Sequence, residues 1–336
     1  MNKNRKQTTN PLGEHKIIQI IQNYLTPMPN MPIQFGDDVS AVNLDRTKVA
    51  VLKTDMLVAK TDVPKKMTLF QAARKAIVMN ISDFASKGVS PTAALVALGL
   101  PKAFTQKNVE EIAKGLNAGA QEYGAYIIGG DTGETSDLII SVSLFGTAKK
   151  STLMLRNGAK PGDFLAVTGF FGKPAAGLRL LLNGCKASAD LRKALIKTVF
   201  LPKARLDQGL ALSGCGAVSA SIDSSDGLAW SLHELSRFSA VGFVLHRVPV
   251  AEEVLQFAEC NSLDALELAL YGGEEYELVV TVKPEGWAFA VAAIEAVGGQ
   301  LLSIGKVTEG HEMVLDVDGK KHVIEARGWE HFKSQV

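Results

Sequence analysis

The sequence predicts a two-domain α/β protein, and three observations support this. The chain has 336 residues, of which 46% are hydrophobic, which is enough apolar material for two medium-sized cores. Strand-like runs and amphipathic helical stretches alternate along it, as they do in α/β folds. A turn-rich polar stretch at 148–160 interrupts the alternation. We therefore expect one domain at 13–148 and a second at 149–336.

The first domain is expected to alternate strands and helices. Short β-branched or apolar runs predict the strands, and apolar residues at helical spacing predict the helices. Thr68 is a candidate N-cap for the first of these helices. In chain order, we expect a strand at 49–52, a helix at 68–88, a strand at 95–100, a helix at 105–123, and strands at 125–128 and 138–145.

The second domain is expected to begin with a strand at 164–168, followed by a glycine-bearing turn and a helix near 175–182. Mixed α/β structure should continue to the end. The apolar stripe of Leu228, Leu232 and Leu235 predicts a helix that begins just after Asp226. The N-terminus of that helix would offer backbone N–H groups to an anion.

Composition and charge exclude several classes of function. The 36 Lys and Arg residues nearly balance 35 Asp and Glu, so there is no global field to attract nucleic acid or an anionic membrane. No apolar run approaches the roughly 20 residues needed to cross a bilayer. The three cysteines lie far apart, which argues against a disulfide framework or structural zinc. We expect a cytoplasmic protein with a mobile tail at 1–12.

Acidic residues recur beside small residues at the ends of apolar runs. Ligands of open α/β sheets gather beyond the carboxyl ends of strands. Carboxylates repel phosphates, so an acid-lined nucleotide site implies bridging divalent cations, for which Mg²⁺ is the natural choice. The alternative for any one acid is a turn or cap residue. The segments are Gly36-Asp37-Asp38, Lys53-Thr54-Asp55, Gly129-Gly130-Asp131-Thr132, Asp223-Ser224-Ser225-Asp226-Gly227 and Gly272-Gly273-Glu274-Glu275.

One predicted helix carries an acid in its middle. Asn80 and Asp83 stand at i and i+3 on one face of an otherwise apolar helix, where Asp is locally unfavourable. A functional role explains this placement; a solvated ion pair of Asp83 with Lys87 is the alternative. The common nucleotide-binding and hydrolase motifs are absent, so His233 is interpreted as a surface or packing residue.

Seven motifs, taken in order, resemble the thiamine-monophosphate kinase family. The resemblance runs from about Gly13 to Phe332, and although each motif is weak alone, their order and spacing are specific. Five are the acidic segments above. The others are Lys75-Ala76 to Asn80-Ile81-Ser82-Asp83 and Arg156-Asn157-Gly158-Ala159-Lys160-Pro161-Gly162-Asp163, and Gly328-Trp329-Glu330-His331-Phe332 resembles the family's C-terminal aromatic segment.

The resemblance implies an aminoimidazole ribonucleotide synthetase-like fold. Its N-terminal α/β domain would dimerise through its sheets, and ATP would bind where domains and subunits meet. The implied activity is direct transfer of the ATP γ-phosphate to thiamine monophosphate, giving thiamine diphosphate and ADP. Because both reacting groups are phosphates, Mg²⁺ bridging and in-line positioning should carry the catalysis, with no general base.

The resemblance also implies roles for individual residues, carried over by position in the matched motifs. Asp83, Asp131 and Arg156 are the expected catalytic residues. The implied Mg²⁺ ligands are Asp38, Thr54, Asp55, Asp83, Asp131, Asp223 and Asp226. The implied ATP contacts are Gly130, Asp131, Arg156 and Ser225, and the implied substrate contacts are Asp62, Glu274 and Trp329.

Three positions depart from the family pattern. Lys53 stands where Ser or Thr is usual, Asp62 stands where many members carry a substrate-contacting His, and 132–134 replaces a Thr-Thr-Arg or Ser continuation. These departures leave open another ATP-dependent enzyme of the same superfamily with a different phosphorylated substrate. A nucleotide-binding module without turnover is the remaining alternative, and the many candidate metal ligands argue against it.

Overall fold

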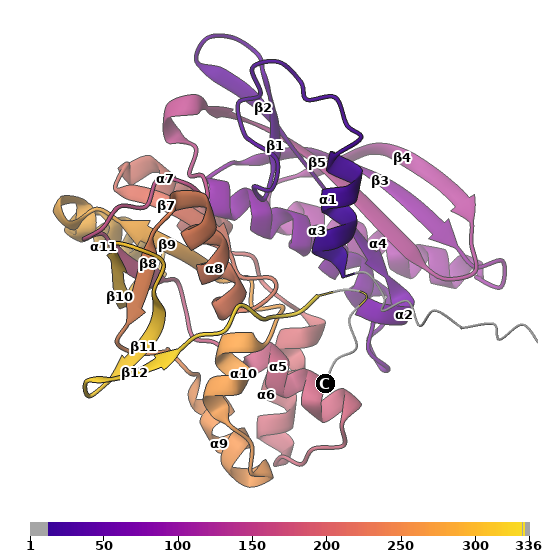
Figure 1. The fold of residues 1–336 in the computed structure, drawn as a ribbon. Helices are drawn as coiled ribbons and strands as arrows, with labels where there is room; N and C mark the ends of the chain where they lie inside the picture. Colours follow the sequence, from indigo (N-terminus) through magenta and orange to yellow (C-terminus); the bar gives the residue numbers. More distant parts are fainter. Residues whose placement is uncertain (1–12, 331, 333–336) are drawn as a thin grey trace, which may run out of the picture.

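The computed structural model describes residues 13–330 and Phe332. Figure 1 shows two sheets with helices packed around them, and a lobe of helices below the second sheet. Every helix and strand expected from the sequence is present, but several strands are longer than expected. The predicted tail at 1–12 lies outside the described residues.

The first sheet is built from the first half of the chain. Its order is β1-β2-β5-β3-β4, and only β3 and β4 run parallel. The helices α3 and α4 pack on one face of it, with α1 and α2 nearby (Figure 1). The elements are α1 (Glu14–Gln22), β1 (Ser40–Asn43), β2 (Lys48–Val58), α2 (Ala59–Asp62), α3 (Leu69–Lys87), β3 (Pro91–Leu100), α4 (Gln106–Glu122), β4 (Tyr126–Glu134) and β5 (Ile139–Lys149).

The second sheet has the order β12-β11-β8-β10-β6-β9-β7. The strands are β6 (Phe164–Val167), β7 (Val218–Asp223), β8 (Gly242–Leu245), β9 (Leu278–Val282), β10 (Leu302–Thr308), β11 (Met313–Val317) and β12 (Lys320–Val323). The helices are α5 (Lys173–Leu182), α6 (Ala189–Phe200), α7 (Leu206–Cys215), α8 (Leu228–Ser239), α9 (Glu252–Asn261), α10 (Ala265–Tyr271) and α11 (Trp287–Ala296), with 3₁₀ turns at Lys150–Thr152 and Pro284–Gly286.

Helix α3 lies between the two halves of the molecule. It packs against β2 and β5 on one side and against α7, β7 and β9 on the other, within one continuous apolar core. The Thr68 cap is confirmed: its hydroxyl accepts from the Gln71 N–H at 3.2 Å, and the Gln71 side chain accepts from the Thr68 N–H at 2.9 Å. The helix stops at Gly88, whose φ of 65° favours glycine. This central helix carries Asp83 to the junction.

The strand registers separate the two faces of the first sheet. On the face toward α3, Lys53 and Asp55 of β2 stand opposite the buried Leu144 and Val142 of β5. On the other face, no described helix covers a set of exposed apolar side chains. These side chains are Leu52, Met56, Leu95, Tyr126 and Phe145, which we call the open face.

None of the helices in the described part of the chain is long and apolar enough to cross a membrane.

Candidate functional site

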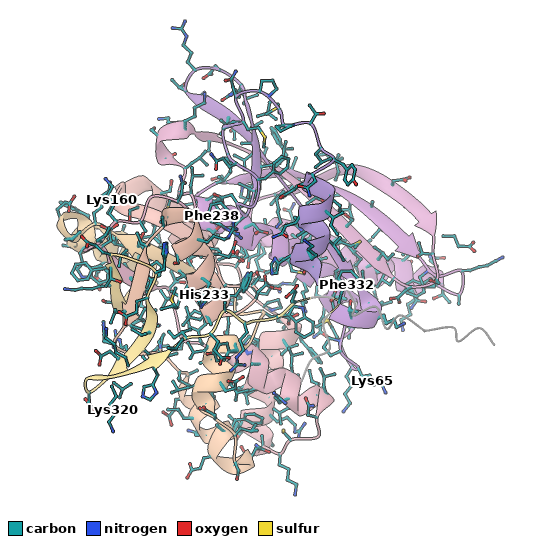
Figure 2. All side chains as sticks on the ribbon, in the orientation of Figure 1. Lys65, Lys160, His233, Phe238, Lys320 and Phe332 are labelled. Atoms are coloured by element: carbon teal, nitrogen blue, oxygen red, sulfur yellow. The ribbon has the colours of Figure 1, made fainter. Side chains whose placement is uncertain are left out.

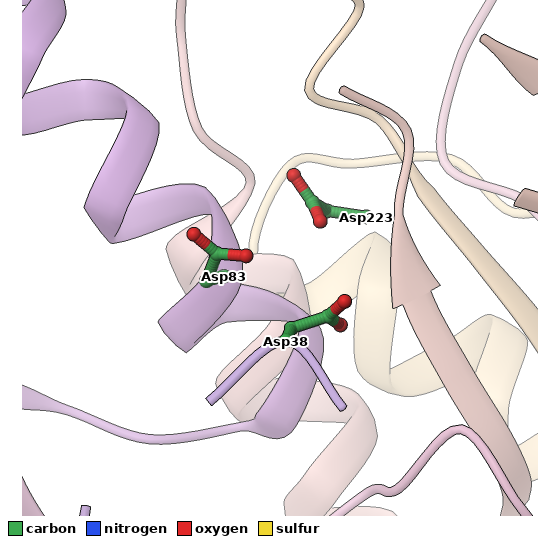
Figure 3. A group of neighbouring side chains, drawn as sticks. All are labelled: Asp38, Asp83 and Asp223. Carbon is green, nitrogen blue, oxygen red and sulfur yellow. The ribbon is translucent and has the colours of Figure 1, made fainter. Parts of the chain in front are cut away.

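Three buried carboxylates meet where the two halves of the chain join. Asp38 lies in the loop before β1, Asp83 lies in α3, and Asp223 is the last residue of β7. Figure 3 shows the three side chains converging. One oxygen from each lies within 4.8 Å of the others, and each residue is at most 7% exposed. Segments separated by up to 185 positions therefore form one acidic cluster.

Two cations hold the Asp38 carboxylate. Its Oδ1 accepts from the Arg156 guanidinium, with the Nε at 2.9 Å, and its Oδ2 lies 2.8 Å from the Lys87 ammonium. The Ser86 hydroxyl also donates to Oδ2 at 2.6 Å. Burial opposes ionisation of Asp38, but Arg156 and Lys87 outweigh it and hold its pKa well below the usual range. Asp38 is therefore ionised at neutral pH.

Lys87 lies wholly in the interior, and its contacts exclude the ion pair considered from sequence. Its ammonium is 2.7 Å from Asp37 and 2.8 Å from Asp38, and it donates to the Ser221 carbonyl at 2.8 Å. The alternative pairing of Lys87 with Asp83 is wrong. Asp83 pairs with Lys53 of β2 instead, at 3.0 Å. Lys87 thus links α3 to the loop before β1 and to β7.

The two carboxyl groups of the 223–227 motif have pKa values raised toward neutral pH. Burial, aided by the charge of Asp38, raises the pKa of Asp223 to about 6. Burial and the charge of Asp223 raise the pKa of Asp226 to about 7. The Ser82 hydroxyl donates to Asp223 at 2.7 Å and opposes the shift of that residue. A cation in the cluster would favour the ionised form of both acids.

The donor set of the cluster fits a hard divalent cation. Carboxylate oxygens from Asp38, Asp83 and Asp223 are ligands that Mg²⁺ prefers, and they approach one another closely enough to share an ion. The buried Ser224 hydroxyl next to Asp223 has no hydrogen-bond partner among the described residues. An oxygen left without a partner is expected near a ligand site rather than in an inert core.

The structure brings only part of the predicted metal set together. Asp55 lies on the α3 face of β2 and contributes to the electrostatics of Lys53, and Asp226 follows Asp223 at the start of α8. Thr54 and Asp131 lie on the opposite face, because Thr54 pairs with the exposed Ser143 and Asp131 with the exposed Ala97. Gly130 stays with Asp131 on β4, away from the cluster. The roles of these residues remain predictions.

The interpretation of the acids as strand ends is confirmed for one motif only. Asp223 ends β7, but Asp55 and Asp131 lie inside β2 and β4, and Glu274 precedes β9. Asp38 precedes β1. Strands β2 and β4 continue past Asp55 and Asp131 because the neighbouring strands β5 and β3 satisfy their backbone hydrogen bonds, whatever the polarity of the side chains.

The Gly272–Glu275 loop closes over the 223–227 motif. The Glu274 N–H donates to the Ser225 carbonyl at 2.6 Å, and the Tyr276 N–H donates to the Ser224 carbonyl at 2.9 Å. Glu274 and Tyr276 both have positive φ, of 67° and 54°, a conformation that costs energy in residues other than glycine. A Cβ on Gly273 would stand 2.7 Å from the Ser225 carbonyl oxygen, so glycine is required there. Ser225 itself is exposed beside this loop.

The three predicted substrate contacts have distinct environments. The Glu274 carboxylate forms an ion pair with Lys75 of α3, whose ammonium also donates to the Asp62 carbonyl at 3.2 Å. The Asp62 carboxylate accepts from the Val58 N–H at 2.7 Å, a local contact between the end of the short helix α2 and the end of β2. The Trp329 N–H donates to the Asp226 carbonyl at 2.9 Å and so fixes the C-terminal segment beside the acidic motif.

An aromatic cavity of ≈ 370 Å³ lies next to Asp226. It is lined by Trp230 of α8, Trp329, and His15 of α1, and the rings of His15 and Trp230 stack at 4.4 Å. By contrast, His233 on α8 faces the C-terminal segment, 2.9 Å from the Ile324 carbonyl, which confirms its packing role (Figure 2).

Comparison with known proteins decides the family. Models of the AIR synthase related proteins match the chain at 36–148 (N-terminal domain) and 160–318 (C-terminal domain). The chain is 35% identical to the thiamine-monophosphate kinase of Nitrosopumilus maritimus, over 96% of this chain and 99% of that protein. It belongs to the thiamine-monophosphate kinase family.

Further relatives agree across distant organisms. The thiamine-monophosphate kinase of Escherichia coli strain K12 is 31% identical over 90% of this chain and 93% of its own. A solved structure described as AaThiL complexed with AMPPCP and TMP superposes with a TM-score of 0.82, at 30% identity, covering 95% of this chain and 97% of that one. The two-domain fold is thus that of the thiamine-monophosphate kinases.

Several residues in and around the acidic site were not predicted from the sequence. Lys87 was considered only as a surface partner of Asp83, and Glu234, which accepts from Arg156 at 2.8 Å, was not considered. The stacked His15 and Trp230 were also missed. A polar or aromatic residue on an otherwise apolar helix face was the available signal, but only tertiary contact identifies its partner.

Proposed function

We propose that this protein phosphorylates thiamine monophosphate to thiamine diphosphate, with ATP as the donor and Mg²⁺ as the metal. The observation that carries the proposal is the buried cluster of Asp38, Asp83 and Asp223 in a chain so similar to thiamine-monophosphate kinases. Two reacting phosphates repel each other, and a divalent cation held by carboxylates offsets that repulsion. A nucleotide-binding module would not need this arrangement.

The chain's own residues would position the reactants. Asp38, Asp83 and Asp223 would hold Mg²⁺, which neutralises phosphate charge and orients the oxygens. The Arg156 guanidinium, only 17% exposed in its side chain, lies beside Asp38 and can donate to a phosphate oxygen. Lys87 keeps Asp38 in place. The acceptor phosphate is already ionised near neutral pH, so positioning supplies most of the rate enhancement and no side chain need remove a proton.

The thiamine moiety of the substrate suits the carboxylate and the aromatic side chain that lie next to the acidic cluster. Thiamine carries a cationic, planar ring, and such rings are attracted to carboxylates and aromatic faces. Glu274 offers the carboxylate, and Trp329 lines the aromatic cavity next to Asp226. We assign these two residues to substrate recognition. The Asp62 carboxylate is engaged by the Val58 N–H at the end of β2, so we assign it to local structure rather than to substrate recognition.

We further infer that the protein is a homodimer joined through the open face of the first sheet. That face exposes Leu52, Met56, Leu95, Tyr126 and Phe145, and a contiguous apolar face of this kind marks an association surface. Thr54 and Asp131 lie on the same face, so pairing would change their surroundings from solvent to subunit interface.

A product assay tests the proposed activity. The purified protein, incubated with Mg²⁺, ATP and thiamine monophosphate, should form thiamine diphosphate and ADP in equal amounts, resolved by chromatography. Omission of Mg²⁺ should abolish both products. ADP formation only with another phosphorylated acceptor would point to a different enzyme of the superfamily, and nucleotide binding without any product would contradict the proposal.

A further inference from the structure

Lys53 places a positive charge among the clustered carboxylates. It lies in the middle of β2, and its register opposite the buried Leu144 directs it toward α3. Its ammonium is 3.0 Å from Asp83 Oδ2, and its side chain is 21% exposed. The backbone that carries this lysine is held by β5, which pairs with β2 along its whole length, and β1 pairs with β2 up to the preceding residue, Leu52.

Lys53 is not interchangeable with the other two cations of the site. Arg156 and Lys87 are both committed to Asp38, on different oxygens, and Lys87 also to Asp37. Lys53 pairs with Asp83, and the charges of Asp55 and Asp38 also favour its ammonium form. Asp83 of α3 and Asp55 of β2 therefore share Lys53 as their counter-ion.

We propose that the Lys53 ammonium is a resident counter-ion that takes the place of a second divalent cation at Asp83 Oδ2. The inference rests on the proposed metal site and defines how that site is populated in this chain. A second divalent ion at Asp83 Oδ2 would meet the like charge of Lys53 a few ångströms away, and such repulsion weakens binding strongly inside a protein. Metal should therefore be confined to the one ion that Asp38, Asp83 and Asp223 hold together.

Metal binding in the absence of nucleotide tests this role independently of catalysis. Mn²⁺ is used as the probe, and its binding is followed by electron paramagnetic resonance and titration calorimetry. Lys53→Met keeps most of the side chain's length but removes its charge. It should bind one more Mn²⁺ per chain than the wild type, or the same number at least about tenfold more tightly. Lys53→Arg keeps the charge and should behave like the wild type.

A matched control and a second measurement keep the outcomes separate. Lys321→Met removes an exposed lysine that pairs with Glu312 on the far sheet, and it should leave Mn²⁺ binding unchanged. Unchanged or weaker binding by Lys53→Met would overturn the proposal. If that variant does not fold, Mn²⁺-soaked wild-type crystals decide: Lys53 within hydrogen-bond distance of Asp83 Oδ2 supports the role, and a second ion at Asp83 Oδ2 in place of the Lys53 ammonium refutes it.

The same experiments distinguish a failure of the inference from a failure of the metal site. If the wild type and all variants bind no Mn²⁺, the proposed metal site is wrong and the inference falls with it. If the wild type binds Mn²⁺ and Lys53→Met binds it no better, only the role of Lys53 is wrong.

Discussion

At the scale of single residues, Asp83 is the member of the carboxylate cluster that the central helix α3 carries. Asp83→Asn keeps its shape but removes one negative metal ligand from the cluster. We expect thiamine diphosphate formation to fall by at least about a hundredfold, because the cation that neutralises the transferring phosphate would be held less tightly. Steady-state product assays measure the loss, and circular dichroism checks the fold. The exposed Asp190→Asn on α6 is the control; retention of most activity by Asp83→Asn would count against the site.

A second single residue, Glu275, is expected to make the stability of the folded protein depend on pH. It is buried, it accepts from the Gly172 N–H, and burial together with the charge of Glu277 raises its pKa well above the usual value. In the unfolded chain the Glu275 carboxyl loses its proton near pH 4.5, whereas in the folded chain it keeps the proton to higher pH. Its contribution to stability is therefore greatest below pH 4.5 and declines as the pH rises toward the folded pKa.

Glu275→Gln removes this titration while keeping an acceptor for Gly172. We expect the melting temperature of the variant, relative to the wild type, to rise as the pH is raised above 4.5, as calorimetry at several pH values would measure. The exposed Glu309→Gln should show no such trend. A difference that stays constant with pH would mean that Glu275 titrates as it does in the unfolded chain.

Residue-level prediction from the sequence succeeded where the cause was local. The Thr68 cap follows from neighbouring residues, so the spacing alone predicted it. The Lys53–Asp83 pair joins a strand to a helix thirty positions later, and Asp38 reaches Arg156 across more than a hundred positions. No local spacing encodes those contacts. The recurrence of acids beside small residues predicted a shared metal site, and the family resemblance indicated which acids belong to it.

At the scale of elements, the packing of α4 on α3 depends on glycine. A Cβ on Gly115 would lie 2.2 Å from the Phe70 carbonyl oxygen of α3. Gly115→Ala should therefore force the helices apart and lower the free energy of unfolding by about 1–3 kcal/mol. Gly214→Ala, in α7 with open space around the added carbon, should be neutral or stabilising by up to about 1 kcal/mol. Chemical denaturation compares them, and equal effects would contradict the close packing.

The sequence predicted helices better than strands at this scale. The helices at 68–88 and 105–123 have caps and periodic apolar faces, and the structure has α3 and α4 within one residue of those bounds at each end. The strand at 125–128 was predicted too short because β4 continues through Gly129–Glu134, where no apolar alternation marks it. Pairing with β3 maintains that segment as a strand despite its composition.

At the scale of the whole molecule, the open face bears on assembly. Met56 and Leu95 are 52% and 50% exposed on it. The double variant Met56→Arg, Leu95→Arg should convert a dimer into a monomer, because four buried charges would face one another across the interface. Light scattering after size exclusion measures the mass. Val323→Arg, on the exposed strand β12, should leave the dimer intact, and a monomeric wild type would refute the interface.

The proposed metal site lies where the two halves of the molecule meet. Crystals grown with Mn²⁺, a non-hydrolysable ATP analogue and thiamine monophosphate would locate the metal by its anomalous scattering. We expect Mn²⁺ at direct-coordination distance, roughly 2.0–2.3 Å, from oxygens of the Asp38, Asp83 and Asp223 cluster and also in contact with a phosphate oxygen. Nucleotide bound in the crystal with all Mn²⁺ remote from these three carboxylates would contradict it.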